Sequence, residues 1–252
     1  MVGGDPQSGG GAEEASGIER ARIAHELVAG MGRVPSAEVP DVLCRTCVSL
    51  LPAMSGLSVS VTPGDLDSGV VLCASDGVAA RLAEIQYTLG EGPGREAVRL
   101  RAPVLAPDLT SARDIRRWPL FSLQAAKAGA GAVFSLPLAG AGSALGTLDL
   151  YRRTPGSLRG AQVRTALLVA DAISLVVVAL DHASPEGVAT WLAGAEADHE
   201  EVHQATGMIM VQLGVRAEEA LLRLRARAFA EGRTSMEMAR AVVDRTLDLR
   251  DE

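Results

Sequence analysis

The chain has 252 residues, of which 48% are hydrophobic but only 3% aromatic, and its formal net charge at pH 7 is -7. This length allows one domain or two, and the hydrophobic fraction is large enough for a core of aliphatic side chains. A net negative charge excludes a protein that coats nucleic acid through positive charge alone, although it is compatible with a small local basic surface.

The N-terminal residues 1–17 are Gly-rich and polar, and this composition predicts disorder. They lack the basic start and the apolar stretch of a signal peptide, and no run of about 18 apolar residues follows them. We therefore expect a cytoplasmic protein with no membrane span. In that compartment the three cysteines, Cys44, Cys47 and Cys73, are expected to be reduced thiols.

The next two segments are predicted from hydrophobic periodicity. A helix is expected at residues 18–31, within a segment 18–35 that Gly32 and Pro35 bring to an end. Residues 36–182 contain segments with the apolar spacing of helices and segments with the alternation of strands. This mixture predicts an α+β domain with a central antiparallel sheet and flanking helices. The expected strands are GLSVSVTPG, SGVVLCASD, residues 103–106, GAVFSLPLAG and SALGTLDLYRR, and the expected helices lie at about 38–51, 76–88, from Pro93, in WPLFSLQAAKAG and at 159–182.

The C-terminal part is predicted to be helical throughout. Residues 183–190 read as a short linker, and residues 191–249 as an all-α three-helix bundle. The helices are expected at 196–213, at 217–230 and from Thr234 or Ser235 to about Leu249, with Glu237 placed for a capping box. Gly214 and Gly232 are expected to close the first two of them.

Several segments within residues 36–182 follow one another in the order found in a known family. They are QYTLGEGPGREAV, APVLAPDL, RWPLFSLQAAKAGAGAVFSLPL and LGTLDLYRR. Together they resemble the GAF domains of actinobacterial regulators. The resemblance implies a domain that senses a small molecule or mediates dimerisation. The pattern of cyclic-nucleotide-binding GAF domains is not evident, and GEGPG lacks the Lys and Ser/Thr of a phosphate-binding loop.

A second resemblance covers residues 191–249. The segment QATGMIMVQLGVRAEEALLRLRARAFAEGRTSMEMARAVVD resembles the ANTAR domain, a three-helix RNA-binding module of transcription antiterminators. The resemblance implies a homodimer that binds hairpins in nascent transcripts and promotes antitermination. Its packing positions correspond to Ala205, Gly207, Ala220, Leu224, Ala228 and Ala239.

Gly207 is expected to mark a close crossing between helices. A glycine inside a helix costs about 1 kcal/mol relative to alanine, and a neighbouring helix that needs the room would explain it. On this interpretation Gly207→Leu would overpack the crossing. Met208 and Met210 are expected to fill the core.

The candidate RNA contacts come from the middle of this segment, where seven arginines face five acidic residues between Val215 and Leu247. Arginines could contact phosphate or stack on unpaired bases. Thr206 stands where ANTAR proteins often have a lysine. A solvated face for Arg223 and Arg227, and an ion pair within the bundle for Arg225, stay open as alternatives. The candidates are His203, Gln204, Thr206, Arg223, Arg225, Arg227 and Arg233.

In the α+β domain, Trp118, Phe121 and Phe134 could line an apolar pocket with Asp108 at its rim, or could simply be core residues. Cys44 and Cys47 are interpreted as buried thiols rather than a redox pair. We expect no enzyme, no catalytic residue, no metal and no cofactor. The alternatives are a sensory module whose helical tail binds protein or DNA and, less favoured, a GAF-type methionine sulfoxide reductase.

The long helix expected at 159–182 has more apolar positions than one sheet face needs. Together with the helix at 18–31, its spare face is predicted to form a two-fold interface.

Overall fold

The structure is a computed structural model, and it describes residues 10–31, 34, 38–61, 70–139, 144–183 and 200–251. Its strands are β1 (Gly56–Val61), β2 (Val70–Ala74), β3 (Val104–Ala106), β4 (Ala132–Ala139) and β5 (Ala144–Arg152). Its helices are α1 (Gly10–Met31), α2 (Val39–Leu50), α3 (Gly77–Leu89), α4 (Pro93–Leu100), α5 (Ala112–Arg117), α6 (Pro119–Lys127), α7 (Gly160–Ala183), α9 (Ala217–Ala230), α10 (Ser235–Val243) and the short 3-10 helix η2 (Leu249–Asp251). A further helix covers residues 200–213.

The five strands form one sheet in the order β2-β1-β5-β4-β3, and every neighbouring pair is antiparallel. This confirms the predicted α+β class and its antiparallel sheet. Strand β5 lies at the centre, because it pairs with β1 through Val59 and Leu148 and with β4 through Phe134 and Leu150. The first and last parts of the domain are therefore joined in the middle of the sheet.

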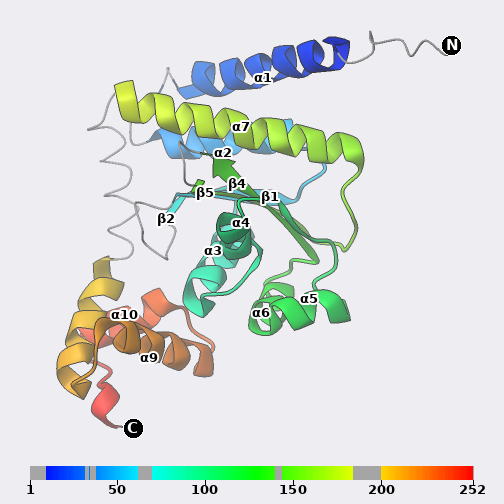
Figure 1. Cartoon of the computed structure of the whole chain (residues 1–252). Helices are drawn as coiled ribbons and strands as arrows, with labels where there is room; N and C mark the ends of the chain where they lie inside the picture. The colour runs from blue at the N-terminus through cyan, green and yellow to red at the C-terminus, as the bar shows by residue number, and fades with distance from the viewer. Residues whose placement is uncertain are drawn as a thin grey trace, which may run out of the picture.

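Each face of the sheet carries its own apolar core, because successive side chains on a strand point to opposite sides. Phe134, Leu136, Leu148 and Leu150 pack with α1, α2 and α7 on one face. Val133 and Tyr151 belong to the core of the other face, which α3, α4, α5 and α6 cover (Figure 1). The sheet thus separates two layers of helices.

Helix α7 lies against the first of these faces. In the described part of the chain it is the one helix whose length and composition would suffice to cross a membrane, with a mean hydropathy of 1.7 over Gly160–Val178. Arg164 and Asp171 interrupt the apolar run of this helix, so it is not an unbroken stretch of about 18 apolar residues. Val169, Ile173 and Val176 are buried in the core beneath it.

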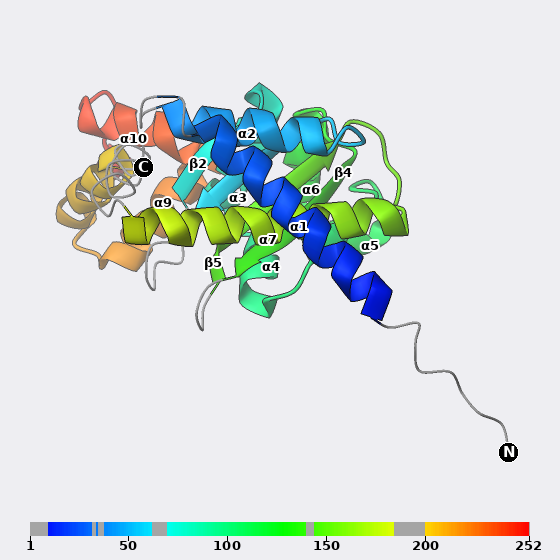
Figure 2. The same ribbon diagram turned by 90° about the horizontal axis from the view of Figure 1, so that it is seen from above.

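Helix α1 crosses the outer side of α7 (Figure 2). Arg20 on α1 forms an ion pair with Asp171 on α7 at 3.1 Å, and Ile23 and Leu27 are fully buried. The helix begins at Gly10 rather than at Ile18, so it includes residues that were predicted to be disordered, while residues 1–9 lie outside the described ones. Much of the apolar surface that was predicted to meet a second copy is covered here within one chain.

The cysteines correct a second prediction. Cys44 on α2 and Cys73 on β2 form a disulfide, with their Cα atoms 6.1 Å apart. They meet because α2 packs across β1 and β2, a contact that the spacing of the cysteines along the sequence does not reveal. Cys47 stays a free, buried thiol, and burial raises its pKa to about 12.

The C-terminal helices share a third apolar cluster. Helix α9 has the predicted bounds, and the predicted capping box at Thr234 and Glu237 is present. Helix α10 ends at Val243, earlier than predicted, because Arg245 adopts a left-handed conformation with φ of 57°. The predicted linker after Ala183 and the predicted start of the first bundle helix, residues 196–199, lie outside the described residues.

Candidate functional site

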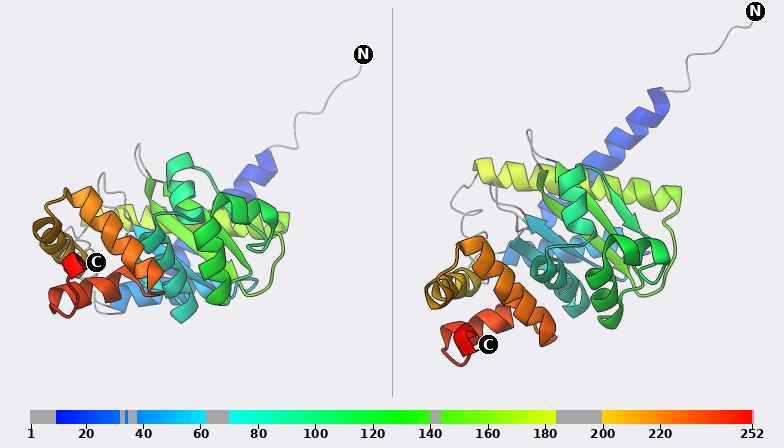
Figure 3. Two further views of the ribbon diagram at one scale, coloured as in Figure 1. Left: turned by 90° about the horizontal axis from the view of Figure 1, so that it is seen from below. Right: turned by 60° about the horizontal axis from the view of Figure 1, so that its bottom comes forward.

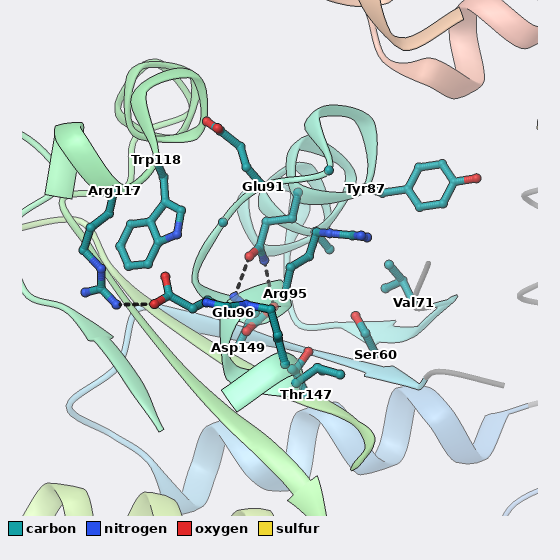
Figure 4. A pocket seen from close by; sticks show the side chains of 17 residues that line it. Ser60, Val71, Tyr87, Glu91, Arg95, Glu96, Arg117, Trp118, Thr147 and Asp149 are labelled. Atoms are coloured by element: carbon teal, nitrogen blue, oxygen red, sulfur yellow. Dashed lines mark hydrogen bonds and ion pairs between the residues drawn. The ribbon is translucent and has the colours of Figure 1, made fainter. Parts of the chain in front are cut away.

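A cavity of about 540 Å³ lies between the sheet and helices α3 and α4 (Figure 4). Strands β1 and β5 supply its floor through Ser60, Thr147 and Asp149. These side chains reach it because they point away from the face that α7 covers. This volume is in the range of small-molecule sites, which run from about 300 to 1,000 Å³.

The floor of the cavity is polar and held in place. The Gln86 amide nitrogen donates to Oδ2 of Asp149 at 2.9 Å, and Oε1 of Gln86 accepts from the Gly94 backbone N–H at 2.7 Å. Burial raises the pKa of the Asp149 carboxyl. The side chains of Ser135, which lies opposite Asp149 in the ladder, and of Thr147 also hydrogen-bond to this carboxyl. The cavity therefore offers buried polar groups to a ligand.

Two glycines of the GEGPG turn allow this arrangement. A Cβ on Gly92 would lie 2.5 Å from Oε1 of Gln86, and a Cβ on Gly94 would lie 2.8 Å from Oδ2 of Asp149. Gly92 also has a φ of 141°, which L-residues rarely adopt. The turn brings the start of α4 against the cavity floor, and this contact explains a motif that does not fit a phosphate-binding loop.

The rim of the cavity is basic where α4 borders it. Arg95 and Arg99 lie one turn apart on α4. Arg117 forms an ion pair with Glu96 at 3.0 Å and lies 4.1 Å above the Trp118 ring. With Glu96 engaged in this way, the arginines of α4 give the entrance a local positive charge that suits an anionic group.

A second glutamate of the rim is engaged at the start of α6. The Glu91 carboxylate accepts the backbone N–H groups of Leu120 and Phe121, at 2.8 and 2.7 Å. A carboxylate at a helix N-terminus is stabilised by these unsatisfied donors. Glu91 therefore ties the turn before α4 to α6, where its negative charge remains beside the arginines of the rim.

The predicted pocket residues do not gather in this cavity. Trp118 lines it, but Phe121 and Phe134 are fully buried in the cores on opposite faces of the sheet. Asp108 lies in a surface turn, where Thr110 donates to it and lowers the pKa of its carboxyl. The cavity residues that the sequence analysis missed are Ser60, Gln86, Arg95, Thr147 and Asp149. The polar alternation in β5 was the available signal for the last two.

The helical bundle docks on the C-terminal end of α3 (Figure 3). Tyr87 of α3 belongs to the apolar cluster of the bundle, and the guanidinium carbon of Arg225 on α9 lies 5.3 Å from the centre of its ring. The Ser235 backbone N–H at the start of α10 donates to the Thr88 hydroxyl at 3.1 Å. Tyr87 also lines the cavity, so one side chain belongs to both sites.

The predicted RNA contacts are divided between surface and interior. His203 and Gln204 are exposed. Arg223 and Arg227 form ion pairs with Glu219 and Glu231 on the surface of α9, at 2.7 and 2.5 Å. Arg233 contacts Glu231 and the backbone carbonyl of Glu237.

Two of the candidates are placed differently from what the sequence suggested. Thr206 is buried, and its hydroxyl donates to the Val202 carbonyl at 2.6 Å, so it does not present a surface contact. Arg225 is half-buried, and its guanidinium carbon lies 5.3 Å from the centre of the Tyr87 ring.

The interpretation of Gly207 as a close crossing was wrong. The residue is exposed, and a Cβ on it would meet no atom of the described residues within 4 Å. The buried stripe of this helix runs through Val202, Ala205 and Ile209, and Gly207 lies about 200° around the helix from Ala205. Gly207→Leu would therefore extend into open space instead of overpacking. Met208 is partly buried against the cluster and Met210 is exposed. The other predicted packing residues, Ala205, Ala220, Leu224, Ala228 and Ala239, are fully buried.

The family model of the GAF domain matches residues 36–178, which include all five strands. Among solved structures, the chain is similar to the GAF domain of a phosphoenolpyruvate-protein phosphotransferase from Coxiella burnetii, at 12% identity and a TM-score of 0.49, covering 67% of this chain and 98% of that one. It is also similar to the second GAF domain of DevS from Mycobacterium smegmatis, at 20% identity and a TM-score of 0.41, covering 60% and 97%. No curated protein matches the chain.

Proposed function

The chain belongs to the GAF domain family through residues 36–178, and from this premise we propose that it is a signal-dependent regulator that binds RNA hairpins through its C-terminal bundle. GAF domains are typical of signal sensing in regulators. The observation that carries the sensory half is the cavity with its polar floor and basic rim. The RNA-binding half is supported by the ANTAR-like sequence of the bundle and by the arginines exposed on α9.

The cavity favours a small polar ligand with two kinds of group. A hydrogen-bond donor, such as a hydroxyl or an amino group, would suit the Asp149 carboxyl at the floor. An acidic group would lie near Arg95 and Arg99 at the rim. Both features fit a sensory site, and neither requires a cofactor or a metal.

We do not propose an enzyme. The disulfide joins Cys44 to Cys73 in the core that faces α7, on the other side of the sheet from the cavity. The remaining thiol, Cys47, is buried in the same core and has a raised pKa. A reductase that uses these cysteines would need a reactive thiolate beside its substrate, which this arrangement does not supply.

The RNA proposal predicts the effect of removing two exposed arginines. In the full chain, Arg223→Ala with Arg227→Ala should weaken binding to hairpins selected from a random RNA pool by roughly tenfold or more. The slope of log affinity against log salt should flatten by about 2, because each lost phosphate contact removes close to one released counterion. The melting temperature should barely change, since exposed ion pairs contribute little to stability.

Arg22→Ala is the matched control for this experiment. Arg22 is also exposed and also pairs with glutamates on its own helix, but it lies on α1, outside the bundle. It should leave affinity and salt slope unchanged. If the double variant binds the selected hairpins as tightly as the wild type, the α9 surface is not the RNA site. A wild-type protein that binds double-stranded DNA more tightly than any RNA of the pool would favour a tail that binds DNA. A wild-type protein that binds no nucleic acid would favour a tail that binds protein.

We further propose a homodimer. Ile18 and Val28 on α1 and Leu167 and Leu175 on α7 keep exposed apolar side chains on the outer side of the domain. A second copy covering these residues would remove them from water. Light scattering at micromolar concentration should give twice the mass of the chain, and Leu175→Glu should shift it toward the monomer. A wild-type monomer under these conditions would remove the dimer from the account.

A further inference from the structure

The last turns of α3 hold the bundle through three separate contacts. Arg225 of α9 stacks on Tyr87, and the Ser235 N–H donates to Thr88. The Met236 N–H donates to the Glu84 carboxylate, which also accepts from the Thr88 hydroxyl at 3.2 Å. We name Glu84, Tyr87 and Thr88 the α3 latch. Three contacts from two helices of the bundle converge on five consecutive positions of one helix.

The latch is a desolvated contact rather than a loose surface encounter. Tyr87 is 7% and Thr88 5% exposed. Burial raises the pKa of the Glu84 carboxyl and of the Tyr87 hydroxyl, although Arg225 opposes this effect on Tyr87. Polar groups removed from water in this way hold a contact in one geometry, because any other geometry leaves them unsatisfied.

From these contacts we infer that the α3 latch holds the bundle in a state of low RNA affinity by occupying Arg225. This inference rests on the proposed RNA-binding function. The guanidinium carbon of Arg225 lies 5.3 Å from the centre of the Tyr87 ring, and Arg225 also hydrogen-bonds to this tyrosine, so in the docked bundle the guanidinium is engaged by Tyr87 instead of a base or a phosphate. Arg223 and Arg227 stay on the surface of α9, so the latched bundle keeps part of its RNA surface and lacks the rest.

The α3 latch borders the cavity, so a ligand bound there would lie beside it. Tyr87 and Gly90 both line the cavity, and a Cβ on Gly90 would lie 3.7 Å from Nη1 of Arg225. Gln86, which holds Asp149 at the cavity floor, is the residue before Tyr87. A ligand that shifts this turn of α3 therefore acts on the tyrosine that Arg225 contacts.

The test uses the full chain and variants that change only the α3 side, so that α9 and α10 keep every side chain. Tyr87→Ala removes the ring, and the milder Thr88→Val removes the acceptor of the Ser235 N–H while conserving volume. Tyr151→Phe is the control, because it removes a hydrogen bond to Asp76 elsewhere in the domain. Affinity is measured for hairpins selected with the wild type, and docking is measured by hydrogen exchange of residues 84–90 and 217–230.

Both latch variants should exchange faster in these two segments and bind the hairpins more tightly. If the wild-type bundle is undocked about one tenth of the time, full opening raises the affinity roughly tenfold, because apparent affinity scales with the competent fraction. Tyr151→Phe should change neither. Faster exchange with unchanged or weaker affinity overturns the latch, and so does unchanged exchange in both variants. If neither wild type nor variants bind any RNA, the proposed function itself fails, whereas equal binding by all of them contradicts the latch alone.

Discussion

Gly146→Ala should lower the free energy of unfolding by about 4 kcal/mol, combining typical costs of overpacking and of backbone strain. Gly146 lies in β5 where the strand pairs with Val61 of β1 and with Leu138 of β4. A Cβ there would lie 2.7 Å from the Val61 Cα and closer still to the Ser60 carbonyl oxygen, and the φ of Gly146 is 156°. The neighbouring atoms are backbone atoms of β1, so they cannot move aside without disturbing the β1–β5 pairing.

Urea unfolding followed by circular dichroism measures this change. Gly77→Ala is the control, because Gly77 has no atom within 4 Å of its virtual Cβ and begins α3. That substitution should be neutral or slightly stabilising. Equal stabilities for Gly146→Ala and Gly77→Ala would mean that β1 and β5 do not approach as the structure shows. The floor of the cavity would then be in question as well, since Ser60 and Thr147 are paired beside this glycine.

The second large effect is expected from the disulfide between Cys44 and Cys73. Reducing it should lower the free energy of unfolding by about 3 kcal/mol, because the bridge closes a loop with a sequence separation of 29 and restricts the unfolded chain. The measurement compares urea unfolding of the oxidised protein with and without a thiol reductant. The bridge ties α2 to the edge strand β2, so the loss should appear in the α+β domain.

Two single substitutions isolate this effect. Cys44→Ala should lower the stability of the oxidised protein and abolish the response to reductant. Cys47→Ala leaves the bridge intact and should keep the response, although it creates a small buried void. A wild-type protein with the same stability in both conditions would show that the bridge does not constrain the unfolded chain.

Periodicity in the sequence predicted most of the secondary structure, because strands and helices leave local patterns of apolar residues. The strands around Val59, Phe134 and Leu148 were expected with nearly the observed bounds, as were α9 and the capping box at Thr234. These features depend on neighbours within about one turn or one strand. Gly207 shows the limit, because the cost of a glycine inside a helix does not reveal which face of that helix is buried.

The candidate site could not be predicted in the same way, because it is formed by contacts between residues far apart in the sequence. Gln86 and Asp149 are 63 positions apart, and their pairing depends on α3 lying over β5. Cys44 meets Cys73 only through the packing of α2 on the sheet. Arg225 meets Tyr87 across two structural units. Local patterns carry no information about such pairs, so the sequence placed these residues on elements without predicting which of them meet.

The proposal that this chain regulates transcripts is tested most directly by sequencing RNA crosslinked to it in its own host. Wild-type protein should recover hairpins that lie upstream of transcription terminators, and the protein with Arg223→Ala and Arg227→Ala should lose them. Arg22→Ala should recover the same hairpins as the wild type. Crosslinked RNA that is no more abundant than background, or that is the same for wild type and double variant, would contradict the account.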